Sequence, residues 1–210
     1  MASHRIILAS QSPRRRELLT LAGVAFEVMP MAIDETPHRG EAPDAYVLRL
    51  AREKARAALV ALSAEAAAGL ACDAETLAEP IVIAADTTVS VDGDILEKPL
   101  DSEQARIMLG RLSGRRHQVC TGVALARGAW LEAFLCSSTV QFAAIDAASI
   151  DAYVATGEPM DKAGAYAVQG GAQAFIERIE GSYTGIMGLP LAETLERLRL
   201  LVHAPREANG

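Results

Sequence analysis

The sequence predicts an α/β protein built on a mixed β-sheet, because strand and helix patterns alternate along the chain. The apolar stretch RIILA at 5–9 has the pattern of a buried strand and leads directly into a helix start. A longer apolar run at 80–96 turns to alternation and contains an Asp-Gly pair, a strong signal for a tight hairpin turn. Two further stretches, 117–126 and 131–145, have the pattern of paired strands. Ligand sites in such sheets tend to lie at strand ends.

The N-terminal half predicts two helices. The first begins after Ser12, whose hydroxyl can cap the free amides, with Pro13 at the first helical position. Residues 26–35 predict a strand that runs into a loop ending in an acidic pair. A long helix is expected from about Pro43 into the sixties, fading into an alanine-rich connector near 63–79.

The C-terminal half predicts three helices and a glycine-rich region. Residues 102–112 and 147–155 predict two short helices. The glycine-rich region spans 157–190, and an amphipathic helix is expected at 192–202. The last eight residues, 203–210, are expected to form a loose tail.

Length and composition narrow the class of protein. The 210 residues fit a single domain over 1–202, and 50% of them are apolar, so the chain can bury a substantial core. A formal net charge of −7 argues against a general nucleic-acid-binding protein. The chain has neither a membrane-length apolar run nor a signal-peptide pattern. We therefore expect a cytoplasmic protein without nucleic-acid or membrane partners.

The cysteines and histidines give no sign of a transition-metal site. Cys72, Cys120 and Cys136 are widely spaced and form no CxxC pair, so we interpret them as reduced, small apolar residues. The four histidines lack metal-ligand spacing. Any metal bound here would be a hard cation held by carboxylates, water and substrate oxygens.

Three consecutive arginines occupy the first turn of the first predicted helix. Arg14, Arg15 and Arg16 lie where the helix dipole disfavours cations by about 0.3–1 kcal/mol. One interpretation is that an anion binds there, held by free N–H groups and arginine side chains. The alternative is three solvated arginines that reach away from the helix end. This stretch alone leaves both interpretations open.

Asp86 ends the apolar run IVIAA and is followed by Thr87 and Thr88. A carboxylate is therefore expected inside or at the edge of a buried element, where an unpaired charge is costly. It is either a functional group or an aspartate that orders a loop by accepting backbone amides, and the two interpretations stay open here.

Lys54 falls on the apolar side of the long helix. Val47, Leu50, Lys54 and Ala58 recur at helical spacing, which places an ammonium group among core residues. The common explanation is a lysine that extends from the margin of the core to water. The alternative is a lysine directed across a cleft at a phosphate or a carboxylate.

Other polar residues are weaker candidates when taken singly. Asp34 and Glu35 form an acidic pair on a loop, and Lys98 follows the hairpin; such groups are usually solvated. Lys162 and Gln169 are polar side chains in the glycine-rich region that could contact a phosphate or a base. Together the candidates supply cations for phosphate, carboxylates for a divalent ion and an amide for recognition. That combination suggests phosphoanhydride hydrolysis.

Several segments occur in order between about residues 6 and 195: LASQSPRRRELL, the acidic pair with Glu35, LAREKARA, AADTTV, LEKPLD, LSGRRHQVCTGVAL, GEPMDKAGAYAVQG and IEGSYTGIMGLPL. The set resembles the Maf family of nucleoside triphosphate pyrophosphatases and covers nearly the whole chain. Thr88 and Glu97 depart from the family pattern without removing a charged residue of the cleft.

The resemblance implies a mixed, curved sheet with flanking helices and two lobes around a deep substrate cleft. It implies a metal-dependent cut between the α and β phosphates that releases a nucleoside monophosphate and pyrophosphate. The segment DKAGAY at 161–166, with Gln169, is similar to the branch that acts on dTTP and UTP. Relatives specific for 7-methyl-GTP carry a cysteine-bearing segment there.

The resemblance also implies roles for single residues. Asp86 matches the proposed proton acceptor, and Arg14, Thr87 and Gln169 match positions linked to substrate choice. The expected catalytic residues are Asp86, Glu35 and Lys54; the expected substrate-binding residues are Ser10, Arg14, Arg15, Thr87, Lys98, Lys162 and Gln169; and the expected metal ligands are Glu35 and Asp86.

The expected cofactor is Mg²⁺ or Mn²⁺, the expected substrate is a pyrimidine nucleoside triphosphate, and family analogy favours a homodimer. The alternative to an enzyme is a protein of another class that has the same basic cleft. A regulatory module could bind the nucleotide without cleaving it, or the chain could be an interaction protein in cell division.

Overall fold

The computed structural model describes residues 4–68 and 79–203 and contains one mixed sheet in the order β2-β1-β3-β5-β6-β7, with β4 paired to β3. Strand β1 pairs in parallel with β2 and β3, whereas the other strand pairs are antiparallel. The strands are β1 (Ile6–Leu8), β2 (Glu27–Val28), β3 (Ile81–Val91), β4 (Asp94–Leu96), β5 (Arg116–Arg127), β6 (Trp130–Phe142) and β7 (Ile176–Glu180). The predicted α/β class and mixed sheet are confirmed.

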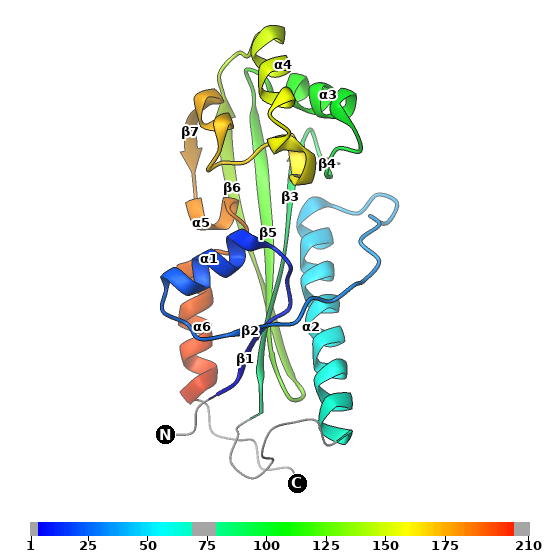
Figure 1. Ribbon diagram of the computed structural model, residues 1–210, viewed down its shortest axis with the longest axis vertical. Helices are drawn as coiled ribbons and strands as arrows, with labels where there is room; N and C mark the ends of the chain where they lie inside the picture. Colours follow the sequence, from blue (N-terminus) through cyan, green and yellow to red (C-terminus); the bar gives the residue numbers. More distant parts are fainter. Residues whose placement is uncertain (1–3, 69–78, 204–210) are drawn as a thin grey trace.

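Helices surround the long strands at both ends of the molecule (Figure 1). The helices are α1 (Pro13–Leu21), α2 (Pro43–Ala67), α3 (Ser102–Leu112), α4 (Ala147–Ala155), α5 (Tyr183–Ile186) and α6 (Leu191–His203), with 3-10 turns at Glu158–Asp161, Ala163–Ala165 and Gly171–Phe175. At one end of the sheet, α2 lies on one side of β3 and β5, while α1 and α6 lie on the other (Figure 1). At the other end, α3 and α4 pack on the tips of the same strands.

The hydrophobic core follows this division into two lobes. One cluster joins α3, α4 and the 3-10 turns to the ends of β3, β5 and β6. Two further clusters lie on opposite faces of the sheet, one beneath α1 and α6 and one beneath α2. The core therefore agrees with the two-lobed sheet that the family resemblance implies.

Strand β3 directs its side chains alternately to the two faces of the sheet. Val82 and Ala84 pack in the cluster under α2, whereas Ile83 and Ala85 pack in the cluster under α1 and α6. Because side chains alternate along a strand, Asp86 faces α2, and Thr87 faces α1. The neighbouring polar side chains of Asp86 and Thr87 therefore lie on opposite faces of the sheet and contact different helices.

A glycine allows α2 to lie close to the sheet beside Asp86. Gly122 on β5 is paired with Asp86 in the antiparallel register. A Cβ atom at Gly122 would lie 2.4 Å from the carbonyl oxygen of Val47 on α2. Only glycine permits this approach of helix to strand, and it brings the next turns of α2 over the strand position of Asp86.

The glycine-rich region differs most from the elements expected from the sequence. It contains the three 3-10 turns, strand β7 and the short helix α5, none of which was assigned individually from the pattern. The described part of the alanine-rich connector continues α2 to Ala67, and residues 69–78 lie outside the described residues, as does Cys72. Of the predicted tail, His203 belongs to α6, and 204–210 lie outside the described residues. No helix among the described residues has both the length and the apolar character needed to cross a bilayer.

Candidate active site

A cleft of about 840 Å³ opens between the two lobes. Its walls come from the start of α1, the loop after β2, helix α2, strand β3, the residues after β4 and the turns before β7. Nine of the ten predicted site residues line it: Ser10, Arg14, Arg15, Glu35, Lys54, Asp86, Thr87, Lys98 and Lys162. A volume of this size suits a nucleotide-sized ligand.

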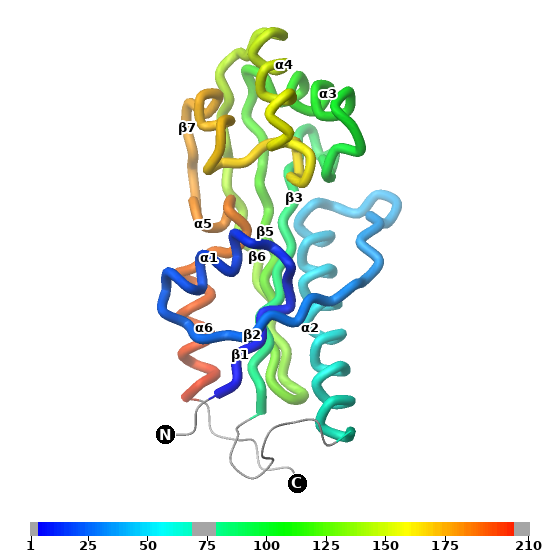
Figure 2. The backbone as a smooth tube through the Cα atoms, in the orientation of Figure 1, coloured from blue at the N-terminus to red at the C-terminus, as the bar shows by residue number. Residues whose placement is uncertain are grey.

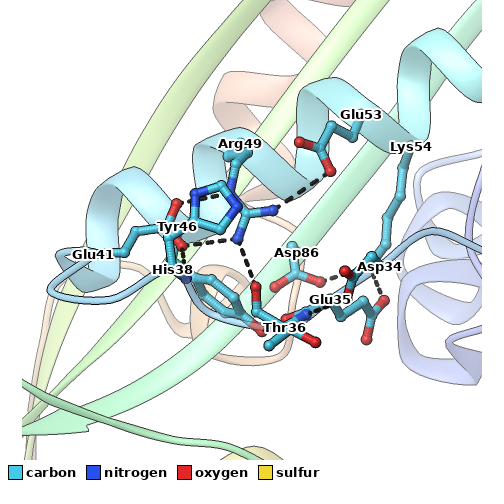
Figure 3. Close-up of polar contacts among 10 residues, drawn as sticks. All are labelled: Asp34, Glu35, Thr36, His38, Glu41, Tyr46, Arg49, Glu53, Lys54 and Asp86. Atoms are coloured by element: carbon cyan, nitrogen blue, oxygen red, sulfur yellow. Dashed lines mark hydrogen bonds and ion pairs between the residues drawn. The ribbon is translucent and has the colours of Figure 1, made fainter.

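Lys54 lies between two carboxylates at the centre of the cleft. Its Nζ is 2.7 Å from Oδ1 of Asp86 and 2.6 Å from Oε1 of Glu35 (Figure 3). Lys54 and Asp86 are buried, whereas about half of the Glu35 side chain is exposed. The lysine is therefore directed at carboxylates within the cleft, which decides between the two interpretations of its position on the apolar side of α2.

Opposing effects act on the pKa of Glu35. Burial raises it, whereas the hydrogen bond from Lys54 and the positive charges of Lys54, Lys98 and Arg15 lower it and outweigh burial. Glu35 is therefore held as a carboxylate in a cationic environment. Such a group can ligate a cation or accept a hydrogen bond.

The three arginines of α1 have three different surroundings. Arg16 is exposed, Arg14 lies half-buried on the cleft wall, and Arg15 is buried. The Arg14 side chain makes no hydrogen bond or ion pair with any residue in the described ranges 4–68 and 79–203. Burial lowers the pKa of Arg14, and the charge of Asp161 across the cleft partly opposes this. Arg14 is therefore available to an anionic ligand.

Arg15 instead joins several parts of the chain. Its Nε donates to the carbonyl of Gly188 at 2.7 Å, and its Nη1 donates to Ser10 Oγ at 3.1 Å and to the carbonyl of Ala85 at 2.8 Å. Its Nη2 donates to Thr87 Oγ1 at 3.0 Å. Four of the five N–H bonds of a guanidinium group are thus used, which leaves one for a ligand.

Thr87 continues this network across the sheet. Its hydroxyl also pairs with Thr121 Oγ1 at 2.9 Å, and Thr121 donates to the carbonyl of Gly185 at 2.8 Å. The hydroxyls on β3 and β5 therefore connect Arg15 to helix α5. Beside this network, the buried Thr88 hydroxyl has no hydrogen-bond partner among the described residues.

The remaining predicted residues differ in their placement. Lys98 is exposed at the mouth of the cleft, and Lys162 lines the wall, where its Nζ contacts Asp161. Gln169 is exposed in the turn after Tyr166 and does not line the cleft. The structure thus brings nine predicted residues together and leaves Gln169 outside the walls. Its role in base selection stays a prediction.

Sequence reasoning gave no site role to several polar residues of the cleft wall, among them Tyr46 and Asp161. Tyr46 precedes Lys54 by eight residues on the buried side of the same helix, and this spacing was the available signal. Asp161 stands in the segment DKAGAY, but the charge it directs at Arg14 depends on the approach of the two lobes. No local sequence pattern predicts how closely the two lobes approach each other.

Across residues 4–68 and 79–203, no group of three or more His, Cys, Asp or Glu side chains is arranged to hold a metal ion. The cleft instead offers the pair Glu35 and Asp86 around Lys54. Mg²⁺ is commonly held by one or two carboxylates, with water and substrate phosphates completing its shell. The pair therefore fits a cation that arrives with a nucleotide, and does not form a complete protein site.

Comparison with known proteins matches the chain to a family over nearly all of the described residues. The family model described as "Maf-like protein" matches residues 5–201. A protein of Anaeromyxobacter sp. (strain Fw109-5) is 49% identical, with 98% of this chain and 94% of the relative covered. A protein of Methylobacillus flagellatus is 50% identical, with 93% and 92% covered, and one of Methylococcus capsulatus is 46% identical, with 94% and 91% covered. All three relatives bear the name dTTP/UTP pyrophosphatase.

Proposed function

Because this chain belongs to the Maf-like protein family, we propose that it is a nucleoside triphosphate pyrophosphatase that hydrolyses dTTP and UTP. The products are the nucleoside monophosphate and pyrophosphate. The observation that carries the proposal is similarity to enzymes of that name over almost the full length of both chains. Modified pyrimidine nucleotides are proposed as further substrates, and removal of non-standard nucleotides as the physiological role.

The chemistry proposed for the cleft is hydrolysis of the α–β phosphoanhydride. Water adds its oxygen to one of the two phosphorus atoms, and the bond from that phosphorus to the bridging oxygen breaks. The carboxylate of Asp86 takes the proton that the water loses. The 2.7 Å contact with Lys54 supports this assignment, because it fixes the orientation of the Asp86 carboxylate.

The cations of the cleft are proposed to stabilise the phosphates. Arg14 and Lys98 make no hydrogen bond to the described residues and line the cleft, so their charges are available to the triphosphate. Arg15 contributes its one remaining N–H, and through two of the others it holds the Ser10 and Thr87 hydroxyls in place. Lys162 is proposed to contact the nucleotide from the opposite lobe.

We propose Mg²⁺ or Mn²⁺ as the cofactor, with Glu35 and Asp86 as its protein ligands. Two carboxylates at one lysine ammonium group support this assignment, since the chemistry of both groups suits a hard cation. When bound, the cation neutralises negative charge on the phosphates. A cytoplasmic location and a homodimeric assembly complete the proposal, the first expected from the sequence and the second from the family resemblance.

The first experiment incubates the protein with dTTP, UTP, CTP, 5-methyl-UTP, pseudo-UTP, GTP and 7-methyl-GTP in Mg²⁺, Mn²⁺ or EDTA. Pyrophosphate and orthophosphate are measured separately at catalytic protein concentration. Metal-dependent pyrophosphate from dTTP and UTP is the expected result. Activity confined to 7-methyl-GTP would contradict the substrate assignment. Binding without turnover would favour a nucleotide-sensing module or a cell-division interaction protein.

A further inference from the structure

The loop that carries Glu35 contains no helix or strand of its own. Residues 29–42 leave β2, cross to α2 and run to the N-terminal end of that helix (Figure 2). A segment without helix or strand hydrogen bonds must be ordered by other contacts. The side chains that hold it therefore control where the Glu35 carboxylate lies.

Two side chains of α2 hold the main chain at Glu35 and at the next residue, Thr36. The hydroxyl of Tyr46 donates to the carbonyl of Glu35 at 2.8 Å. Nη2 of Arg49 donates to the carbonyl of Thr36 at 3.1 Å. Two successive carbonyls are thus bound to the helix, while the Glu35 side chain points the other way, to Lys54 (Figure 3).

Arg49 is itself fixed by carboxylates from both sides. Its Nε and Nη2 bind the two carboxylate oxygens of Glu41 at 2.7 and 2.8 Å, a bidentate pair. Nη1 reaches Glu53 on the next turn of α2 at 3.5 Å. Glu41 Oε2 also accepts the backbone N–H of His38 at 2.9 Å. Both halves of the loop are therefore tied to one guanidinium group.

The pair is well enclosed for an ion pair near the surface. The Arg49 and Glu41 side chains are 18% and 9% exposed. The hydrogen bond from Arg49 lowers the pKa of Glu41 to about 2 and raises that of Arg49. Both groups are therefore charged at neutral pH.

We propose that Arg49 and Glu41 are positioning residues that hold the Glu35 carboxylate at Lys54 by fixing the loop 29–42 to α2. The proposal rests on the function proposed above, because Glu35 is taken to act in the cleft. Neither Arg49 nor Glu41 lines the cleft, so neither is placed to contact a ligand bound there. Their effect on turnover is therefore expected to pass through Glu35.

The test compares Arg49→Ala with Arg56→Ala, which removes an exposed arginine from the same helix. Loss of a residue that orients a ligating or catalytic group typically costs about 10–100-fold in activity. We expect that loss in kcat for Arg49→Ala, a smaller loss for Arg49→Lys, and wild-type activity for Arg56→Ala. Lysine keeps the charge but not the bidentate fork. Circular dichroism verifies that each variant is folded, and Glu41→Gln probes the same contact from the loop side.

A double-mutant cycle with Glu35→Gln separates positioning from general destabilisation. If Arg49 acts through Glu35, adding Arg49→Ala to Glu35→Gln lowers kcat by less than about twofold, since coupled residues are not additive. The same fold loss in both backgrounds, or wild-type kcat in Arg49→Ala alone, overturns the proposal.

Amide hydrogen exchange followed by NMR gives a readout that does not need activity. Removal of charge-assisted hydrogen bonds from the loop is expected to speed exchange of the His38 and Thr36 amides by about tenfold or more. Arg56→Ala should leave both amides unchanged. If the wild-type protein releases no pyrophosphate, the proposed function fails, and the exchange result alone decides whether Arg49 holds the loop. Unchanged exchange in Arg49→Ala overturns that.

Discussion

Each arginine of the first helical turn meets a different set of partners, although the three are adjacent in sequence. The side chain of Arg15 enters the protein and binds four acceptors, that of Arg14 borders the cleft, and that of Arg16 is in water. The two interpretations open at the sequence level were an anion site and a solvated cluster. The structure shows Arg16 solvated, leaves Arg14 available to an anion, and gives Arg15 a third role, cross-linking of the chain, which no local pattern contained.

The most direct test at the residue scale is Asp86→Asn. The amide keeps the shape of the side chain but is a far weaker proton acceptor, so we expect kcat to fall by about 10²–10⁴-fold while nucleotide binding persists. Pyrophosphate release and calorimetric binding of dTTP are measured on the same sample. Unchanged turnover would remove Asp86 from the chemistry. Loss of binding together with turnover would assign it to substrate affinity instead.

At the scale of elements, the approach of α2 to the sheet decides the geometry of the lysine–carboxylate cluster. The helix lies against Gly122 of β5, and the same strand position pairs with Asp86 of β3. Lys54 reaches Asp86 because no side chain separates helix and sheet at this point. Gly122 on β5 thus contributes to the short distance between Lys54 Nζ on α2 and the Asp86 carboxylate on β3.

Gly122→Ala should therefore impair both stability and activity. The added methyl group would meet the backbone of α2, which cannot move freely, and overpacking of this kind costs about 1–3 kcal/mol. The matched control is Gly110→Ala within α3, where a Cβ meets nothing within 4 Å. That change should stabilise the protein by about 0.5–1 kcal/mol through helix propensity. Urea denaturation measures both, and equal effects would contradict the close approach.

The ion pair between Arg49 and Glu41 predicts a pH dependence of stability. The hydrogen bond from Arg49 lowers the pKa of Glu41 in the folded protein from 4.5 to about 2. A carboxyl group with a depressed folded pKa stabilises the fold above its unfolded pKa, and the contribution is lost as the pH falls from 4.5 towards 2. The free energy of unfolding of wild type minus that of Glu41→Gln should shrink over this range. A difference that is constant with pH would contradict the pair.

The elements themselves were largely predictable, and the tertiary contacts were not. The first residues of α1 and α2 are Pro13 and Pro43, as predicted, and the position of Lys54 among core residues followed from helical spacing. Strand β7 was missed because its sequence IERIE is short and two charged residues interrupt its alternation. The contact between Arg15 and Gly188 spans 173 residues, and no periodic pattern encodes such a pairing.

For the whole molecule, the cleft between two lobes predicts that nucleotide stabilises the fold. The walls include Lys54 and Asp86 on one side and Lys162 and Tyr166 on the other, so a bound ligand contacts both lobes. A ligand at about 100 times its Kd adds about 2.7 kcal/mol to the stability of the folded state. A non-hydrolysable UTP analogue should therefore raise Tm, and Arg14→Ala should reduce the shift. An unchanged Tm at saturating analogue would contradict binding between the lobes.

The guanidinium group of Arg15 also links activity to the completion of the polypeptide during translation. Arg15 leaves the ribosome early, whereas the carbonyl of Gly188 that accepts its Nε proton is made 173 residues later. At about 5–20 residues per second, the arginine waits roughly 9–35 s for this partner. Until then the cleft lacks the hydrogen bond between Arg15 and Gly188, two of the residues that line it. Nascent chains and truncated products that end before Gly188 are therefore expected to be inactive.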